Sequence, residues 1–316
     1  MKKILLSILL ILAFATSGQT ATCTFQSGGV DLNWSTTGNW DCGHVPLAGE
    51  PVIIPGLIAV MDVARIPATS GKIASLTATT TGQITVDFAN ARFAASAGSI
   101  NVTGDIQAAE KPTAAGFILI SGAGGAGNVF TVDAANIIGG SNASSTGITA
   151  TSSSGTLAIV GHVKGGSSVG THGVSTTANG LAITVSNGAE GGSGSLAYGV
   201  NCGTGSSTVT VTGNVTGGTG IASSGAFSTC SGTFTITNSN LINGTGGVAL
   251  GGKVPVWSPG NTNYLSWYDT GAGSAKSFYV DTDPTEAKVQ TGTSYIFQGV
   301  TKNGSYSAGG GGAWGF

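Results

Sequence analysis

Charged side chains are scarce in this chain of 316 residues: Asp, Glu, Lys and Arg make up 8% of it, against about 25% in ordinary soluble domains. Helical bundles and coiled coils need charged helix faces, and each of the 55 glycines would weaken a helix by about 1 kcal/mol relative to alanine. An all-helical fold is therefore excluded. With 11 basic residues and a formal net charge of -2, the chain also lacks an electrostatic basis for binding nucleic acid or anionic lipid.

Prolines are few as well, with 8 in the chain, and glycine does not recur at every third position, which excludes a collagen helix. Hydrophobic residues make up 40% of the sequence, so there is apolar surface to bury and a disordered chain is disfavoured. What remains is a β-rich and turn-rich protein.

The N-terminus carries the pattern of an export signal. Lys2 and Lys3 precede an apolar run from Ile4 to Ala15, and small and polar residues follow up to Ala21. This order is typical of a cleavable secretory signal, and the run is too short to span a bilayer comfortably. We expect residues 1–21 to be removed and the mature chain to be extracellular or on the cell surface, without membrane insertion.

Four cysteines follow the signal, at Cys23, Cys42, Cys202 and Cys230. An even count in an exported chain is typical of disulfides. Sequence proximity favours the pairs Cys23–Cys42 and Cys202–Cys230, although the connectivity stays open. A metal site is not expected, because the nearby pair Cys42 and His44 lacks two further ligands.

A 26-residue repeat dominates the middle of the chain. Paired small residues recur at this spacing, at Gly139-Gly140, Gly165-Gly166, Gly191-Gly192, Gly217-Gly218 and Asn243-Gly244. Apolar residues alternate before each pair, as in Leu157-x-Ile159, which is the pattern of a half-buried strand. The first and last repeats carry one extra residue before Ile137 or Leu241, which predicts a bulge or a wider turn there.

One such unit holds three or four core side chains, too few to offset the entropy lost on ordering it. The units must therefore stack as coils about 4.8 Å apart and share backbone hydrogen bonds, and the handedness of parallel crossovers makes the coil right-handed. We predict an all-β fold, a right-handed parallel β-helix of about seven coils over residues 72–252. An N-terminal cap over residues 22–71 covers its first coil.

The expected N-terminal cap carries a pattern of its own. Its elements are, in order, Trp34, Trp40, Gly43, Pro46, Gly49-Glu50 and Val52-x-Ile54. The pattern resembles the opening of glycine-rich β-helical modules in bacterial surface proteins and in the extracellular domain family named for its eight glycines, over residues 31–106. The resemblance implies extracellular presentation and adhesion, with no catalytic residues to carry over. We expect the two tryptophans to form the core of the cap.

Aromatic residues gather at the C-terminus, where 11 of the 22 fall from Trp257 onward. We expect an aromatic-rich β cap or interaction segment over residues 253–316, ending in a flexible glycine-rich tail. Its aromatic side chains either close the end of the core or form a contact surface for glycans or proteins. The candidate contact residues are Trp257, Tyr264, Trp267, Tyr268, Tyr279 and Trp314.

An active site is not expected in the coils. Parallel β-helices host polysaccharide lyases and hydrolases, which need clustered carboxylates or a basic residue on one face. The charged residues between 128 and 252 are Asp133, Lys164 and Glu190. His162 and His172 find no carboxylate at neighbouring columns, so no catalytic residue, metal ligand or cofactor is assigned. A catalytic group built from carboxylates of the C-terminal segment stays an alternative.

The sequence thus predicts a secreted, non-catalytic β-solenoid that serves as a surface-exposed structural or adhesive protein. Its expected partners are glycans or cell-surface proteins, and its solenoid ends offer a route to self-association. The alternatives are a polysaccharide lyase or hydrolase of pectate-lyase-like architecture and a self-assembling extracellular fibre or matrix subunit.

Overall fold

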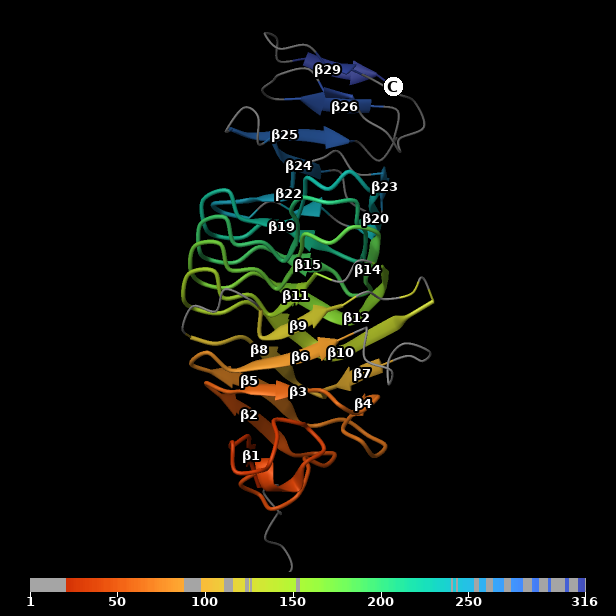
Figure 1. Cartoon of the computed structure of the whole chain (residues 1–316). Helices are drawn as coiled ribbons and strands as arrows, with labels where there is room; N and C mark the ends of the chain where they lie inside the picture. Colours follow the sequence, from red (N-terminus) through yellow and green to blue (C-terminus); the bar gives the residue numbers. More distant parts are fainter. Residues whose placement is uncertain are drawn as a thin grey trace, which may run out of the picture.

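A computed structural model describes residues 21–87, 98–110, 116–122, 125, 127–151, 154–239, 241–242 and 244–252, and beyond these the backbone of short strands between residues 256 and 315. The chain winds into a tall column of stacked coils (Figure 1). The described residues contain no α-helix, and a single 3-10 turn spans Thr37–Asn39. The predicted parallel β-solenoid with about 26 residues per turn is confirmed, with about 8 turns.

Two sheets run along the column. The longer sheet stacks, in this order, β1 (Cys23–Thr24), β2 (Pro51–Pro55), β5 (Ser75–Thr79), β8 (Asp105–Gln107), β10 (Val129–Ile138), β12 (Gly155–Lys164), β14 (Leu181–Val185), β17 (Thr208–Thr212), β20 (Phe234–Ser239) and β23 (Val256–Pro259). Joined to it are β4 (Arg65–Ile66), β7 (Gly98–Asn101), β15 (Ala189–Glu190), β18 (Val215–Thr216) and β21 (Leu241–Ile242).

The second sheet stacks β3 (Ile58–Val60), β6 (Gln83–Asp87), β9 (Ile118–Ser121), β11 (Ile148–Ala150), β13 (Val174–Thr176), β16 (Val200–Cys202), β19 (Ser224–Ser228), β22 (Val248–Gly252), β24 (Tyr264–Asp269), β25 (Ser274–Val280), β26 (Glu286–Val289) and β29 (Gly312–Gly315). A separate hairpin pairs β27 (Tyr295–Ile296) with β28 (Ser305–Tyr306). From β3 to β24 all pairings in this sheet are parallel, as a coil that climbs by one strand per turn requires.

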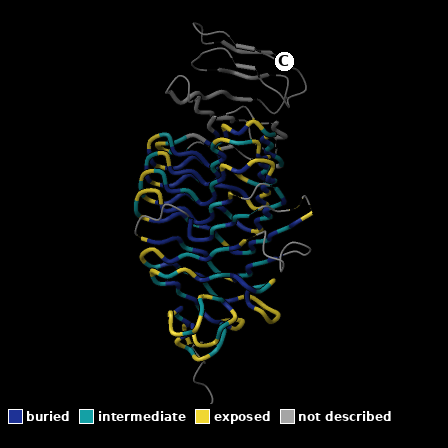
Figure 2. Tube along the Cα trace, viewed as in Figure 1, coloured by how far each residue is buried: buried dark blue, intermediate teal, exposed yellow. Residues whose placement is uncertain are grey.

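The core forms because the repeat length and the strand register agree. Leu157 pairs with Ile183 and Val163 with Ala189, so apolar side chains of successive coils stack on one another. These four side chains are 0–1% exposed. Figure 2 shows buried residues along the inside of the column and exposed residues at the corners and in the N-terminal cap.

The predicted irregularities of the end repeats are present. The β10–β12 ladder shifts register between Asp133 and Asn136. Phe234 pairs with Val209 and Leu241 with Val215, so the sequence offset between paired residues is one position shorter for Phe234 than for Leu241. The extra residue therefore lies between the two inward positions in each case, as the sequence pattern predicts.

The solenoid begins earlier than residue 72. Strands β2 and β3, inside the expected cap, already pair in parallel with β5 and β6 of the next coil. Val52 pairs with Leu76, so the first coil is shorter than the repeat by two positions and escapes a search for the repeat period. The true cap is the shorter segment before β2, and the expected boundary at residue 72 is corrected accordingly.

That shorter cap packs three aromatic rings over the first coil. Trp34 and Trp40 meet edge to face with ring centroids 4.6 Å apart, and Phe25 lies 5.1 Å from Trp40. All three side chains are at most 3% exposed. The expected core role of the two tryptophans is confirmed.

Both disulfides form as sequence proximity favours. Cys23–Cys42 joins β1 to the cap loop with Cα atoms 5.1 Å apart, and Cys202–Cys230 joins two successive coils with Cα atoms 5.7 Å apart. Ser228 is the register partner of Cys202 in the next coil. The second disulfide therefore joins Cys202 to a residue only two positions beyond that partner.

The C-terminal segment continues the second sheet by different pairing. Strand β24 runs parallel to β22, and β25, β26 and β29 then add in antiparallel fashion. In place of a wholly flexible tail, Gly312–Gly315 form β29. The side chains of this segment lie outside the described residues.

Candidate functional site: a polar groove and an apolar ridge

A groove of about 390 Å³ lies where the corners of several coils line up. It is lined by Gln107, Ile138, Gly139, Ser141, Lys164, Gly165, Gly166, Ser167, Glu190, Gly191, Gly192, Ser193 and Thr219. These residues belong to the same columns of the repeat, so the groove follows the stacking direction. The sequence predicted the glycine columns as corners but not the groove that they form.

The floor of the groove is built from the glycine pairs. A Cβ atom at Gly192 would collide with the carbonyl oxygen of Gly166, and one at Gly166 would collide with that of Gly140. The stacked backbones approach so closely here that a side chain does not fit. The floor is therefore closely stacked backbone without side chains, and the glycines that line it are buried.

A column of hydroxyl groups lies beside this floor. Each glycine pair is followed by one hydroxyl residue, Ser141, Ser167, Ser193 and Thr219. Successive members are one coil apart, or about 4.8 Å. Hydroxyl groups donate and accept hydrogen bonds, so the column offers the same polar contact to each repeat of a long ligand.

One charged cluster lies beside the hydroxyl column. Lys164 pairs with Glu190 across β12 and β15, and the Lys164 Nζ lies 2.9 Å from Glu190 Oε1. His162 Nε2 lies 3.6 Å from Glu190 Oε2. The expectation that His162 has no carboxylate neighbour is wrong. His162 and Lys164 lie two positions apart on β12 and project on the same face, so His162 is diagonal to Glu190, the register partner of Lys164 in the next coil. Lys164 and Glu190 are separated by the 26-residue repeat length, and this spacing in the sequence predicts the pair.

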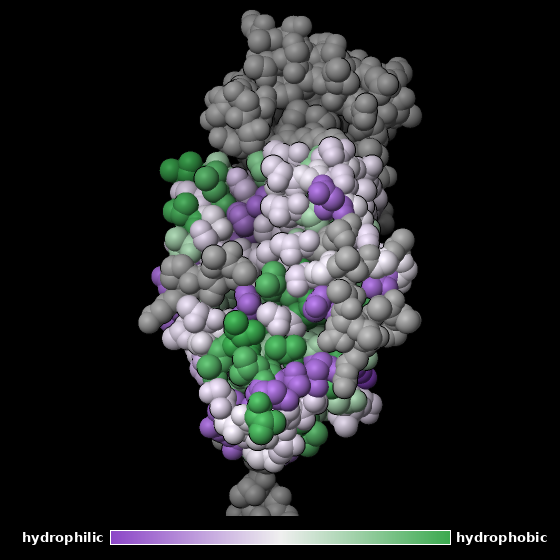
Figure 3. All heavy atoms as spheres, in the orientation of Figure 1, coloured by the Kyte–Doolittle hydropathy of each residue, from purple (hydrophilic) through white to green (hydrophobic). Residues whose placement is uncertain are grey.

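Beyond the groove the corners carry exposed apolar side chains. Val169, Leu196 and Ile221 are 54%, 43% and 76% exposed, and we call these three residues the apolar ridge. Figure 3 shows hydrophobic residues along the edge of the upper coils, where the corners project. Apolar groups gathered beside a polar groove are typical of binding surfaces.

The ridge projects because the corner conformation repeats. Four residues with positive φ form one column, Ser144, Gly170, Leu196 and Ala222, with φ of 62°, 66°, 55° and 55°. This column contains Leu196 of the ridge and directly follows Val169 and Ile221. Left-handed backbone at the same place in every coil gives the successive corners the same path. The groove and the apolar ridge are thus two consequences of one repeated loop.

An aromatic stack lies under the same corners. The rings of His172 and Tyr198 stack with centroids 5.0 Å apart, and Tyr198 stacks on Phe227 at 4.5 Å. The backbone N–H of Tyr198 donates to Nδ1 of His172 over 3.2 Å, which requires that nitrogen to be unprotonated. Burial lowers the pKa of His172 from 6.5 to about 4.

This stack predicts a loss of stability in acid. The unfolded chain protonates His172 near pH 6.5, but the folded chain does so only near pH 4. The contribution of neutral His172 to the free energy of unfolding is therefore full above pH 6.5 and is lost progressively as the pH falls to about 4. The expected loss is roughly 3 kcal/mol. Urea unfolding of the wild type and of His172→Phe at several pH values measures it. If the free energy of unfolding changes with pH between 4 and 6.5 by the same amount in the wild type and in His172→Phe, the loss of stability in acid does not come from His172.

The residues expected to form sites are placed as follows. Trp257 lies in β23, Tyr264, Trp267 and Tyr268 in β24, Tyr279 in β25 and Trp314 in β29. Whether these side chains face the core or the surface lies outside the described residues. The four cysteines form the two disulfides.

A single group of potential metal ligands stands out in the described part of the chain. It contains Cys23, Cys42, His44 and Glu50, and the ligand atoms all lie within 4.8 Å of one another. The fold brings Cys23 and Glu50 beside Cys42 and His44, and the two sulfur atoms are joined in a disulfide.

Asp133 is paired with a distant lysine. Its Oδ1 accepts from Lys72 Nζ over 2.7 Å, between residues 61 positions apart. This contact places the carboxylate at the surface of the lower coils in an ion pair.

Comparisons with known proteins add no assignment. No protein-family model, curated protein or solved structure matches the chain. No helix among the described residues has the length and apolar character needed to cross a membrane. The fold that can be stated is a parallel β-solenoid without an identified family.

Proposed function

We propose that this protein is an exported, non-catalytic β-solenoid that acts as a surface-exposed structural or adhesive protein and binds extended glycans in the groove. The observation that carries the proposal is the hydroxyl column along the glycine floor. A ligand that contacts every coil in the same way must itself repeat along its length. A polysaccharide has this property, and its hydroxyl groups match the donors and acceptors of the groove.

The charged cluster suits recognition of such a ligand. Lys164 and Glu190 are 43% and 35% exposed at their side chains and face the groove, so each is free to exchange part of its ion pair for a sugar hydroxyl or carboxylate. The neighbouring apolar ridge adds a surface for the less polar faces of sugar rings.

The adhesive role rests also on the sequence. The export signal and the tryptophan-to-isoleucine pattern that resembles eight-glycine extracellular modules both favour presentation at the cell surface. Glycans and cell-surface proteins are therefore the proposed partners.

A polysaccharide-degrading enzyme is the competing function, and the trio of His162, Lys164 and Glu190 is the observation that favours it. Hydrolysis by two carboxylates needs a second carboxyl group roughly 5–10 Å away. Among the described residues that line the groove Glu190 is the one carboxylate, which supports binding over hydrolysis.

The two functions are separated by incubating the purified mature chain with a panel of polysaccharides: a neutral β-glucan, xylan, polygalacturonate and alginate. The proposal predicts retention of the protein on at least one of them, with no release of reducing ends or unsaturated products. Product release would replace the adhesive proposal with an enzymatic one, and failure to bind any glycan would contradict glycan recognition.

A further inference from the structure

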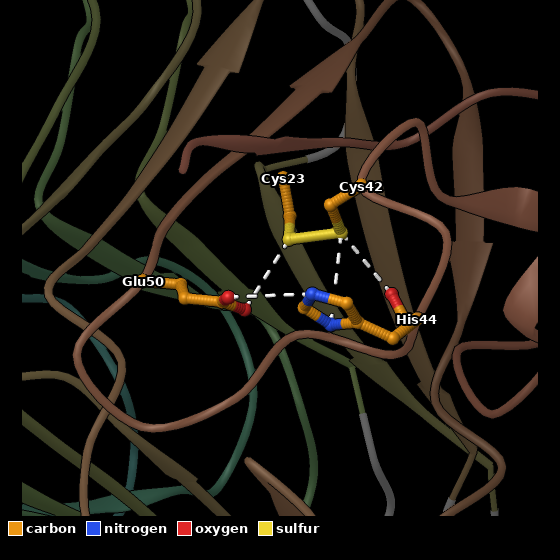
Figure 4. Close-up of side chains that lie close together, drawn as sticks. All are labelled: Cys23, Cys42, His44 and Glu50. Atoms are coloured by element: carbon orange, nitrogen blue, oxygen red, sulfur yellow. Dashed lines mark hydrogen bonds and ion pairs between the residues drawn. A yellow bond between two sulfur atoms is a disulfide. The ribbon is translucent and has the colours of Figure 1, made fainter. Parts of the chain in front are cut away.

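The cap contains a second chemical site, far from the groove, around the disulfide of Cys23 and Cys42. Figure 4 shows the carboxylate of Glu50 and the ring of His44 converging on the two sulfur atoms. Glu50 Oε2 lies 3.3 Å from the Cys23 Sγ, and His44 Nδ1 lies 3.9 Å from the Cys42 Sγ. His44 Nε2 and Glu50 Oε1 are 3.5 Å apart.

The fold positions these four residues from separate segments. Cys23 in β1 pairs with Val52 of β2, which places it beside Glu50, two residues before Val52. The main-chain N–H of Leu47 donates to Glu50 Oε2 over 2.7 Å and fixes the carboxylate. Cys23 and Glu50 are 0% and 8% exposed, so two of the four donors are buried.

His44 is oriented as metal-binding histidines are. Its Nδ1 lies 3.1 Å from the carbonyl oxygen of Val45, which accepts hydrogen bonds only, so Nδ1 carries a proton. A hydrogen bond from one ring nitrogen to a backbone carbonyl leaves the other nitrogen as the ligand. The free nitrogen, Nε2, is the one that faces Glu50.

The surroundings of the disulfide are unusually rich in acceptors. A carboxylate oxygen approaches Cys23 and the His44 carbonyl oxygen lies 3.1 Å from the Cys42 Sγ, yet a disulfide has no proton to donate. Four donor atoms of three kinds, two sulfurs, one nitrogen and one oxygen, thus lie within 4.8 Å of one another. Sulfur and nitrogen donors in a set of four are the preferred ligands of zinc.

We propose that, when the Cys23–Cys42 bond is reduced, Cys23, Cys42, His44 and Glu50 bind one zinc ion. A dithiol reductant breaks the S–S bond: each sulfur gains one electron and one proton, and the dithiol becomes a disulfide. Zinc then replaces the two thiol protons, which are released to solvent. The sulfur atoms need only separate to the spacing of two zinc ligands. The cap is therefore cross-linked in both states, by a disulfide under oxidising conditions and by zinc under reducing conditions.

The test uses the mature full chain, reduced and then titrated with zinc against a chromogenic chelator, with cobalt as a spectroscopic probe. We expect one zinc ion per wild-type chain and visible cobalt bands typical of tetrahedral thiolate ligation. His44→Ala and Glu50→Gln keep all four cysteines, and each is expected to weaken zinc binding by about tenfold or more.

The second disulfide supplies the matched control, since Cys202 and Cys230 lie outside the ligand cluster. Cys202→Ser/Cys230→Ser is expected to bind zinc as the wild type does, whereas Cys23→Ser/Cys42→Ser is expected to lose the site. The proposal is overturned if the reduced wild type binds no zinc, if Cys23→Ser/Cys42→Ser retains it, or if neither His44→Ala nor Glu50→Gln weakens it.

Discussion

Replacing Gly192 by alanine is expected to lower the free energy of unfolding by about 3 kcal/mol. The added Cβ atom would collide with the carbonyl oxygen of Gly166 in the preceding coil, and the carbonyl carbon of Gly165 would lie 2.6 Å from it. Both contacts are with backbone, so relief requires the coils to separate and weakens the hydrogen bonds between them. The backbone of Gly192 is not in the left-handed region, so the expected effect is steric.

Gly203→Ala is the matched control, because its Cβ would meet only Thr177 Cγ2 at 3.5 Å and Thr176 O at 3.6 Å. A change within about 0.5 kcal/mol is expected there. Urea unfolding followed by circular dichroism compares the two variants. Equal stability of Gly192→Ala and Gly203→Ala would show that the coils do not pack at the distance that the structure gives.

Trp34→Ala is expected to cost about 3–5 kcal/mol, because the side chain is 0% exposed and its loss leaves a cavity over the first coil. The Trp34 carbonyl oxygen also accepts a hydrogen bond from Trp40 Nε1 over 2.9 Å. The backbone N–H of Trp34 donates to Val60 O over 2.8 Å. The cavity would therefore open at the point where the cap meets the solenoid.

Trp34→Phe separates aromatic packing from the indole group. The Trp34 Nε1 has no hydrogen-bond partner within the described residues, so its loss removes no bond and the penalty is expected to be smaller than that of alanine. Unfolding monitored by the fluorescence of the remaining tryptophans ranks the variants. If Trp34→Ala is as stable as the wild type, the cap does not close the core.

The repeat made most of the fold predictable. In a stacked solenoid the spacing of identical columns equals the coil length, so Gly165 and Gly191 reveal the register from the sequence alone. The same rule failed where the coil length changes, because the shorter step from Val52 to Leu76 hid the first coil.

The candidate site was less predictable because it depends on neighbours between coils. Lys164 and Glu190 are far apart in sequence and meet only when the 26-residue offset is applied to polar as well as apolar columns. The cluster around Cys23 has no such periodic signal, since the cap loop returns to β2 by an irregular path. A search for short ligand spacings therefore missed Glu50.

Glycan recognition by the groove is tested most directly by one pair of variants. Ser193 is exposed in the groove and Thr184 is exposed on the outer face of β14, outside the groove lining, so Ser193→Arg and Thr184→Arg add the same side chain at two places. Calorimetric titration with a polysaccharide retained by the wild type is expected to show at least tenfold weaker binding for Ser193→Arg and wild-type affinity for Thr184→Arg. Wild-type affinity in both variants would contradict the groove as the binding site.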